Sequence, residues 1–209
     1  YHFSIGAFWL YCELVNMVSH KTVQAFIESL LSVIEAAPGP PCNSDIEPLL
    51  SGLRCQNIET GVAANQGIPT LDHLPFAIRN AQSGPPEIRA LANCLQEIAG
   101  ELPWYQRQEP ALPDFMRGHA NAFIIGPNGL EQRSDIVVGV SLLAPKIEYP
   151  DHNHPPEELY VVMSEGDWRQ NDNPWHAPGL GGFVCNPANI THSMRSGSKP
   201  LLAIWCLWT

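Results

Sequence analysis

The chain has 209 residues, of which 44% are hydrophobic and 15% are charged, with a formal net charge of −10. A chain of this length and apolar content can bury its own core, which excludes a disordered chain. The 20 prolines are nearly twice the usual ~5% and exclude a bundle of long helices, because proline breaks a helix interior. The acidic balance argues against nucleic acid and against an anionic membrane surface as partners.

No run of about 20 apolar residues is present, so no membrane-spanning helix is predicted. The apolar segment 5–18 carries Glu13 and Asn16 and lacks a basic leader, so it is predicted to be a packed helix and not a signal peptide. The six cysteines form no Cys-x-x-Cys pair, and a chain this long does not need disulfides. We therefore expect reduced, mostly buried cysteines and a cytoplasmic protein.

Helical patterns dominate the first half of the chain. Apolar residues recur with a 3.6-residue period in segment 22–37, which ends at the run Pro-Gly-Pro-Pro. A short helix is predicted from a cap at Asn43 or Ser44 through Leu53, and two more are predicted over 70–81 and 85–99.

Short strands follow after Pro113. They are rich in valine, isoleucine and leucine and are separated by Gly, Pro and Asn, as in the turn 126–129. The predicted strands cover 120–125, 135–143, 159–163, 183–186, 192–195 and 201–208. Helices followed by short strands favour an α+β protein whose strands form a sandwich or barrel. We expect a helical region over 1–110 that packs on a β-barrel region over 111–209.

Segment 148–160 carries the side chains with the clearest chemistry. His152, His154, Glu158 and Tyr160 have the same parity, which places them on one face of an extended chain. The prolines at 155 and 156 could interrupt that alternation. Two imidazoles and a carboxylate on one face are typical of a divalent-metal site with open coordination positions. A polar surface turn is the alternative interpretation.

A second segment supports the metal site. Segment 181–192 begins with two glycines, continues as a strand and a proline turn, and ends at His192. Together the two segments resemble the paired motifs of the cupin superfamily. The first motif corresponds to His152, His154, Glu158 and Gly166, and the second to Gly181, Pro187 and His192. Asn189 and Ser196 replace a Gly and an Asn of the second motif. The Asn189 change is mild, because Asn tolerates left-handed backbone.

The resemblance implies a cupin barrel, which is a double-stranded β-helix or jelly roll. It also implies one divalent transition metal ion held by His154, Glu158 and His192, with His152 as a further ligand. These ligands suit iron(II) or zinc, and also manganese, cobalt or nickel. The sequence is also compatible with assembly into a homodimer.

Tyr149 before the histidines, and Glu158-x-Tyr160 after them, make the chain similar to the cupin-type dimethylsulfoniopropionate lyases. That resemblance implies cleavage of a small sulfonium carboxylate, dimethylsulfoniopropionate, into dimethyl sulfide and acrylate by β-elimination. Tyr160 is the expected general base, because a nearby dication favours the phenolate. Tyr149 is the second candidate base or a substrate-binding group. Packing within the barrel is the alternative role of Tyr160, and a strand-edge aromatic is the alternative role of Tyr149.

The cationic end of such a substrate needs an aromatic lining. The candidate residues are Trp104, Tyr105, Phe123, Trp168, Trp175 and Trp205.

Other functions stay open for the same ligand set. They are a cupin dioxygenase with non-haem iron, a non-catalytic cupin that binds a small ligand, and a sugar isomerase or epimerase of the same fold.

Overall fold

The computed structural model describes residues 21–39, 41–55 and 67–209. The predicted first helix is found over 21–35, and the segment 5–18 lies outside the described residues. The next helical elements are α2 (Glu47–Arg54), the 3-10 helix η1 (Pro69–His73), α3 (Leu74–Gln82) and α4 (Pro86–Ile98). The predicted helix 70–81 is divided into η1 and α3. Pro75 stands in the first turn of α3, where proline is tolerated. Its ring would clash inside a longer α-helix, so η1 and α3 do not form one continuous α-helix.

The strands form two antiparallel sheets. The larger sheet has the order β1-β2-β3-β9-β5-β7, and the smaller has the order β4-β8-β6. In chain order the strands, and the short helix α5 before β2, are β1 (Trp104–Tyr105), α5 (Pro113–Gly118), β2 (His119–Ile125), β3 (Val137–Leu143), β4 (Glu148–His152), β5 (Glu157–Val162), β6 (Asp167–Gln170), β7 (Phe183–Asn186), β8 (His192–Arg195) and β9 (Leu201–Trp208). All six predicted strands are present, whereas β1, β4, β6 and α5 were not predicted.

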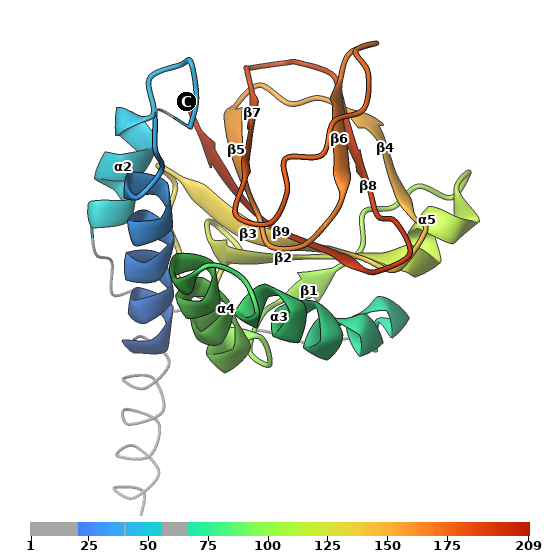
Figure 1. Cartoon of the computed structure of the whole chain (residues 1–209), viewed down its shortest axis with the longest axis horizontal. Coiled ribbons are helices and arrows are strands. Elements are labelled where there is room, and N and C mark those ends of the chain that lie inside the picture. The colour runs from blue at the N-terminus through green and yellow to red at the C-terminus, as the bar shows by residue number, and fades with distance from the viewer. Residues whose placement is uncertain (1–20, 40, 56–66) are drawn as a thin grey trace, which may run out of the picture.

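The smaller sheet faces β5 and β7 across a barrel, and β2, β3 and β9 form the wall nearest the helices (Figure 1). This is the α+β arrangement with a two-sheet barrel that the cupin resemblance implied, so the expected fold class is confirmed. Strand β1, which lies within the 1–110 region, is the edge strand of the larger sheet and pairs with β2.

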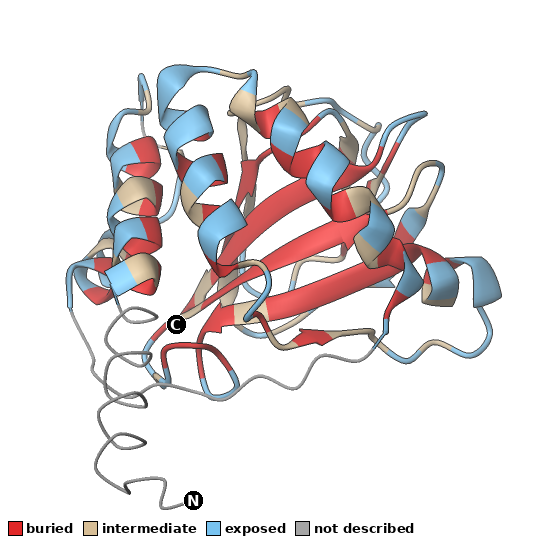
Figure 2. Cartoon of the chain, turned by 90° about the horizontal axis from the view of Figure 1, so that it is seen from below, coloured by how far each residue is buried: buried red, intermediate tan, exposed pale blue. Residues whose placement is uncertain are grey.

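Both faces of the larger sheet are buried. On β9, Ile204 and Cys206 join the apolar cluster shared with the helices, whereas Ala203 and Trp205 belong to a second cluster inside the barrel. This division follows from the two-residue period of a strand. Figure 2 shows the helices lying across the buried sheet. The wall of the barrel therefore belongs to two cores at once.

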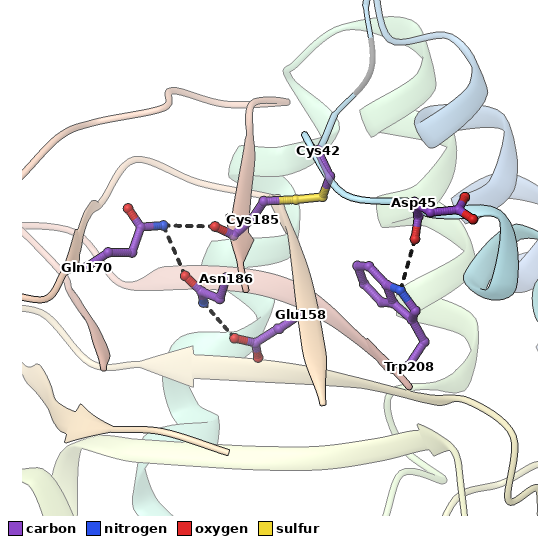
Figure 3. Close-up of a disulfide and its surroundings, with 7 residues drawn as sticks. All are labelled: Cys42, Asp45, Glu158, Gln170, Cys185, Asn186 and Trp208. Atoms are coloured by element: carbon purple, nitrogen blue, oxygen red, sulfur yellow. Dashed lines mark hydrogen bonds between the residues drawn. A yellow bond between two sulfur atoms is a disulfide. The ribbon is translucent and has the colours of Figure 1, made fainter. Parts of the chain in front are cut away.

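The expectation of reduced cysteines is wrong for one pair. Cys42 and Cys185 form a disulfide with a Cα–Cα distance of 5.6 Å, which joins the segment after the first helix to β7 (Figure 3). Their separation of 143 residues leaves no local spacing signal. Among the described residues Cys55 and Cys94 are free but not buried, and Cys206 is free and buried. The disulfide thus pairs two of the cysteines that the cytoplasmic expectation took to be reduced.

In the part of the chain that the structure describes, no helix combines the length and apolarity needed to cross a bilayer.

Candidate metal centre and its cavity

Three histidines meet inside the barrel. His152 ends β4, His154 lies in the turn between β4 and β5, and His192 begins β8. His152 and His192 are direct partners in the β4–β8 ladder, and their ring centroids are 4.1 Å apart. One ring nitrogen from each of the three imidazoles lies within 4.8 Å of the other two. The two predicted motifs are therefore brought together in space.

Backbone carbonyl groups fix the tautomer of each imidazole. The acceptors of the three Nδ1 atoms are the carbonyl oxygens of Pro150, Pro156 and Ile190, each at 3.0 Å. A carbonyl oxygen can only accept, so each Nδ1 carries the proton and each Nε2 keeps a lone pair. The Nε2 of His192 is buried and has no hydrogen-bond partner. Imidazoles oriented in this way are typical of metal ligands.

Glu158 completes the group from β5. Its side chain is 4% exposed, and its Oε2 lies 3.1 Å from Nε2 of His192 and 3.6 Å from Nε2 of His154. Two atoms bound to one divalent ion at ~2.1 Å lie about 3.0–3.4 Å apart, depending on the coordination geometry. The Glu158–His192 distance lies within this range and the Glu158–His154 distance is slightly longer, so small side-chain adjustments would let these residues hold one divalent ion.

The charges agree with that fit. Burial alone would raise the pKa of the Glu158 carboxyl, but the neighbouring His154 and His192 side chains lower it to about 2. Burial and the neighbouring His192 lower the pKa of His152 to about 4. An ionised carboxylate and a neutral imidazole are the forms that bind metal.

These residues meet for a different reason from the predicted one, which was a shared face of one extended strand. His152 and His154 do not lie on one strand face with Glu158 and Tyr160, because the chain turns between β4 and β5. The two strands belong to different sheets, and the side chains meet across the barrel. The prolines at 155 and 156 stand at this turn, where they interrupt the alternation. The substitution at Asn189 is tolerated as expected, since its φ is +62°.

Tyr160 lies on the same face of β5 as Glu158. The side chain is buried, and its ring centroid is 6.5 Å from that of His192. Burial, together with the negative charge of Glu158, raises the pKa of Tyr160 well above its usual value. In this environment the phenol holds its proton unless a positive charge is close by.

Tyr149 approaches from β4, with its ring centroid 4.8 Å from that of His152. Its hydroxyl oxygen accepts a hydrogen bond from Nδ2 of Asn121 at 3.3 Å, and Oδ1 of Asn121 accepts one from Ser141 at 2.7 Å. Burial raises the pKa of Tyr149, but Asn121 and the Arg107 guanidinium oppose that rise. The Ser141–Asn121 pair was not identified from the sequence. Its signal was a polar residue inside each of two mainly apolar strands.

A cavity of about 140 Å³ adjoins these groups. Its polar lining includes His152, His154, Glu158, Asn121 and Ser141. Its aromatic lining consists of Tyr105, Tyr149, Tyr160 and Trp205. A larger surface hollow of about 330 Å³ between α5 and β4 contains neither histidine nor cysteine, so the inner cavity is the candidate site.

Two of the six aromatic candidates line the cavity. They are Tyr105 and Trp205. Phe123 packs behind both, with ring centroids 5.0 Å and 5.6 Å from theirs. Trp205 lies over Gly139, where a Cβ atom would collide with the indole ring. The other three do not line it: Trp104 belongs to the helix-side core, Trp168 packs on Tyr160, and Trp175 lies against the guanidinium groups of Arg169 and Arg195.

The family model for dimethylsulfoniopropionate (DMSP) lyases matches residues 47–203. Among curated proteins, the DddL protein of Cereibacter sphaeroides, assigned as a dimethylsulfoniopropionate lyase, is 28% identical over 141 residues. That match covers 68% of this chain and 59% of the relative. The dimethylsulfoniopropionate lyase DddQ of Ruegeria pomeroyi is 29% identical over 96 residues, which cover 46% of this chain and 47% of the relative. The chain thus spans about half the length of the curated relatives that it matches.

Solved structures share the fold. A chain from the crystal structures of the DMSP lyases RdDddP and RnDddQII has a TM-score of 0.69 at 21% identity, covering 91% of this chain and 94% of that chain. The crystal structure of DMSP lyase DddQ from Ruegeria pomeroyi DSS-3 has a TM-score of 0.67 at 18% identity, covering 90% of this chain and 92% of that chain. The likeness therefore includes the helices as well as the barrel.

Proposed function

Because the chain belongs to the dimethylsulfoniopropionate lyase family, we propose that it cleaves dimethylsulfoniopropionate into dimethyl sulfide and acrylate. The observation that carries this proposal is the composition of the inner cavity. His152, His154 and Glu158 line it together with four aromatic side chains. A substrate with a carboxylate at one end and a sulfonium at the other has complementary chemistry.

The proposed metal ligands are His152, His154, Glu158 and His192, which would hold one divalent ion. Iron(II), zinc, manganese, cobalt and nickel are all compatible with three imidazoles and a carboxylate. Such an ion, when bound, polarises a substrate carboxylate, which acidifies the adjacent C–H bond, and favours the phenolate of a nearby tyrosine.

Tyr160 is the proposed base. It would take the proton from the carbon next to the substrate carboxylate, and the C–H electron pair would form the C=C bond of acrylate. The C–S bond would break with its electrons moving to sulfur, which leaves as neutral dimethyl sulfide. The proton on Tyr160 then passes to solvent. The placement of Tyr160 beside Glu158, inside the cavity, supports this role.

Tyr149 is the proposed substrate-binding group. Asn121 donates to its oxygen, so its own O–H proton is free to point at a substrate oxygen. The alternative proposal exchanges the roles, with Tyr149 as the base and Tyr160 as the substrate-binding group.

The test is incubation with dimethylsulfoniopropionate and detection of dimethyl sulfide in the headspace. Zinc-loaded protein under nitrogen is the informative sample, because elimination needs only a Lewis acid whereas a dioxygenase needs a redox metal and dioxygen. Release of dimethyl sulfide and acrylate in equal amounts supports the proposal. Absence of both products from protein that is shown to contain metal would exclude it.

A further inference from the structure

A hydrogen-bonded pair of amides bridges the two sheets beside the metal centre. Gln170 ends β6, an edge strand of the smaller sheet, and Asn186 ends β7, an edge strand of the larger sheet. The Nε2 of Gln170 donates to Oδ1 of Asn186 and to the carbonyl oxygen of Cys185, both at 3.0 Å (Figure 3). The bridge therefore holds the edges of two separate sheets together.

Each amide also stands next to one proposed ligand. Gln170 is the direct partner of His192 in the β6–β8 ladder, and Asn186 is the direct partner of Glu158 in the β5–β7 ladder. The two proposed ligands come from different sheets. The separation of Glu158 from His192 thus depends on how closely those sheets approach at this point.

The hydrogen bonds of this chain of amides all run in the same direction, from Gln170 through Asn186 to Glu158. The carbonyl oxygen of Cys185 can only accept, so the NH₂ group of Gln170 faces it and also donates to Asn186. The NH₂ group of Asn186 therefore points the other way. It donates to Oε2 of Glu158 at 2.7 Å, and both side chains are buried.

Resting on the proposed metal site, we infer that Gln170 and Asn186 are positioning residues that hold the Glu158 carboxylate at ligand distance from His192. Asn186 fixes the rotation of the carboxylate through Oε2, which is also the oxygen nearest to both His192 and His154. Gln170 acts through Asn186 and fixes the gap between the sheets. The disulfide at Cys185 attaches the same end of β7 to the segment after the first helix, which gives the bridge a rigid support.

The test measures metal affinity and not turnover. Asn186→Leu keeps the approximate shape and removes the donor, and Gln170→Ala removes the outer member of the pair. Partners of metal ligands typically change metal affinity by about 10- to 100-fold, so we expect the Zn²⁺ Kd of Asn186→Leu to rise by that factor. The Kd is measured by competition with a chelating dye, and Co²⁺ absorption spectra report the changed ligand geometry.

Two comparisons keep the inference open to disproof. Asn121→Leu is the matched control, because Asn121 is a buried asparagine of the same cavity with no hydrogen bond to Glu158, and its Zn²⁺ Kd should stay within about twofold. Adding Gln170→Ala to Asn186→Leu should cost less than Gln170→Ala alone, since Gln170 acts through Asn186. If Asn186→Leu does not fold, Gln170→Ala at the half-buried end of the pair decides alone.

An unchanged Zn²⁺ Kd and Co²⁺ spectrum in the folded variants would overturn the inference. Equal losses in Asn121→Leu and Asn186→Leu would also overturn it, because the effect would then be general loosening of the barrel. The proposed function fails separately: wild-type protein that binds Zn²⁺ tightly but releases no dimethyl sulfide contradicts the lyase activity and leaves the positioning role intact.

Discussion

Recognition of the substrate cation can be tested at Tyr105. Tyr105 lines the cavity from β1, is half-buried at the sheet edge, and stacks on Phe123 with ring centroids 5.0 Å apart. Tyr105→Leu removes the aromatic face and keeps an apolar side chain. Tyr105→Phe keeps the face and removes only the hydroxyl, so it is the matched control.

A cation over an aromatic ring gains about 0.5–2 kcal/mol, which corresponds to about 2- to 30-fold in Kd. Two unreactive carboxylates of the same shape separate charge from size. Protonated N,N-dimethyl-3-aminopropanoate carries the positive charge, and 4-methylpentanoate replaces it with carbon. Tyr105→Leu should weaken the charged inhibitor by that factor and change the neutral one by less than about twofold.

The assay is the inhibition constant of each compound against dimethyl sulfide release, and Tyr105→Phe should preserve the preference for the charged compound. An equal loss for both inhibitors in Tyr105→Leu would mean that the ring supplies only apolar contact. A loss in Tyr105→Phe as large as that in Tyr105→Leu would assign the effect to the hydroxyl.

Three further predictions concern the ligands, the base and the helical region. His192→Ala and Glu158→Ala should each lower the metal content of the purified protein, and full metal content in both would contradict the proposed ligand set. Tyr160→Phe should lower kcat by roughly 10²–10⁴-fold with unchanged metal content, whereas loss of turnover only in Tyr149→Phe would exchange the two roles. A fragment of residues 111–209 should be insoluble or metal-free, because it exposes the helix side of the sheet and lacks β1. A fragment that is soluble, loaded with metal and fully active would show that the helices are dispensable.

The features that the sequence predicted correctly rest on local signals. The 3.6-residue period located the helix at 21–35, start and stop signals located α4, and short runs of branched residues located β2, β3 and β9. Both histidine motifs were found because their spacing is local, and the barrel then brought His152, His154 and His192 within reach of one another. Local spacing is therefore enough to find these histidines, although not to explain how they meet.

The features that the sequence did not predict depend on contacts between distant segments. The Cys42–Cys185 disulfide spans 143 residues, and the Ser141–Asn121 pair joins two strands that each look apolar. Strand β4 was missed because Pro150 and charged residues hide its apolar pattern. Its single buried residue, Tyr149, faces the barrel core.

The helical region and the candidate site are coupled through shared strands. On β9, Trp205 lines the cavity while its neighbours Ile204 and Cys206 pack in the core shared with the helices. A shift of that strand by one residue would exchange the two sets of side chains, because the period of a strand is two. The segment after the first helix contacts the larger sheet twice: Trp208 donates from its indole nitrogen to the carbonyl oxygen of Asp45, and Cys42 is bonded to Cys185 (Figure 3). The packing of the helices therefore limits the register of the strands that carry Glu158, Tyr160 and the aromatic lining.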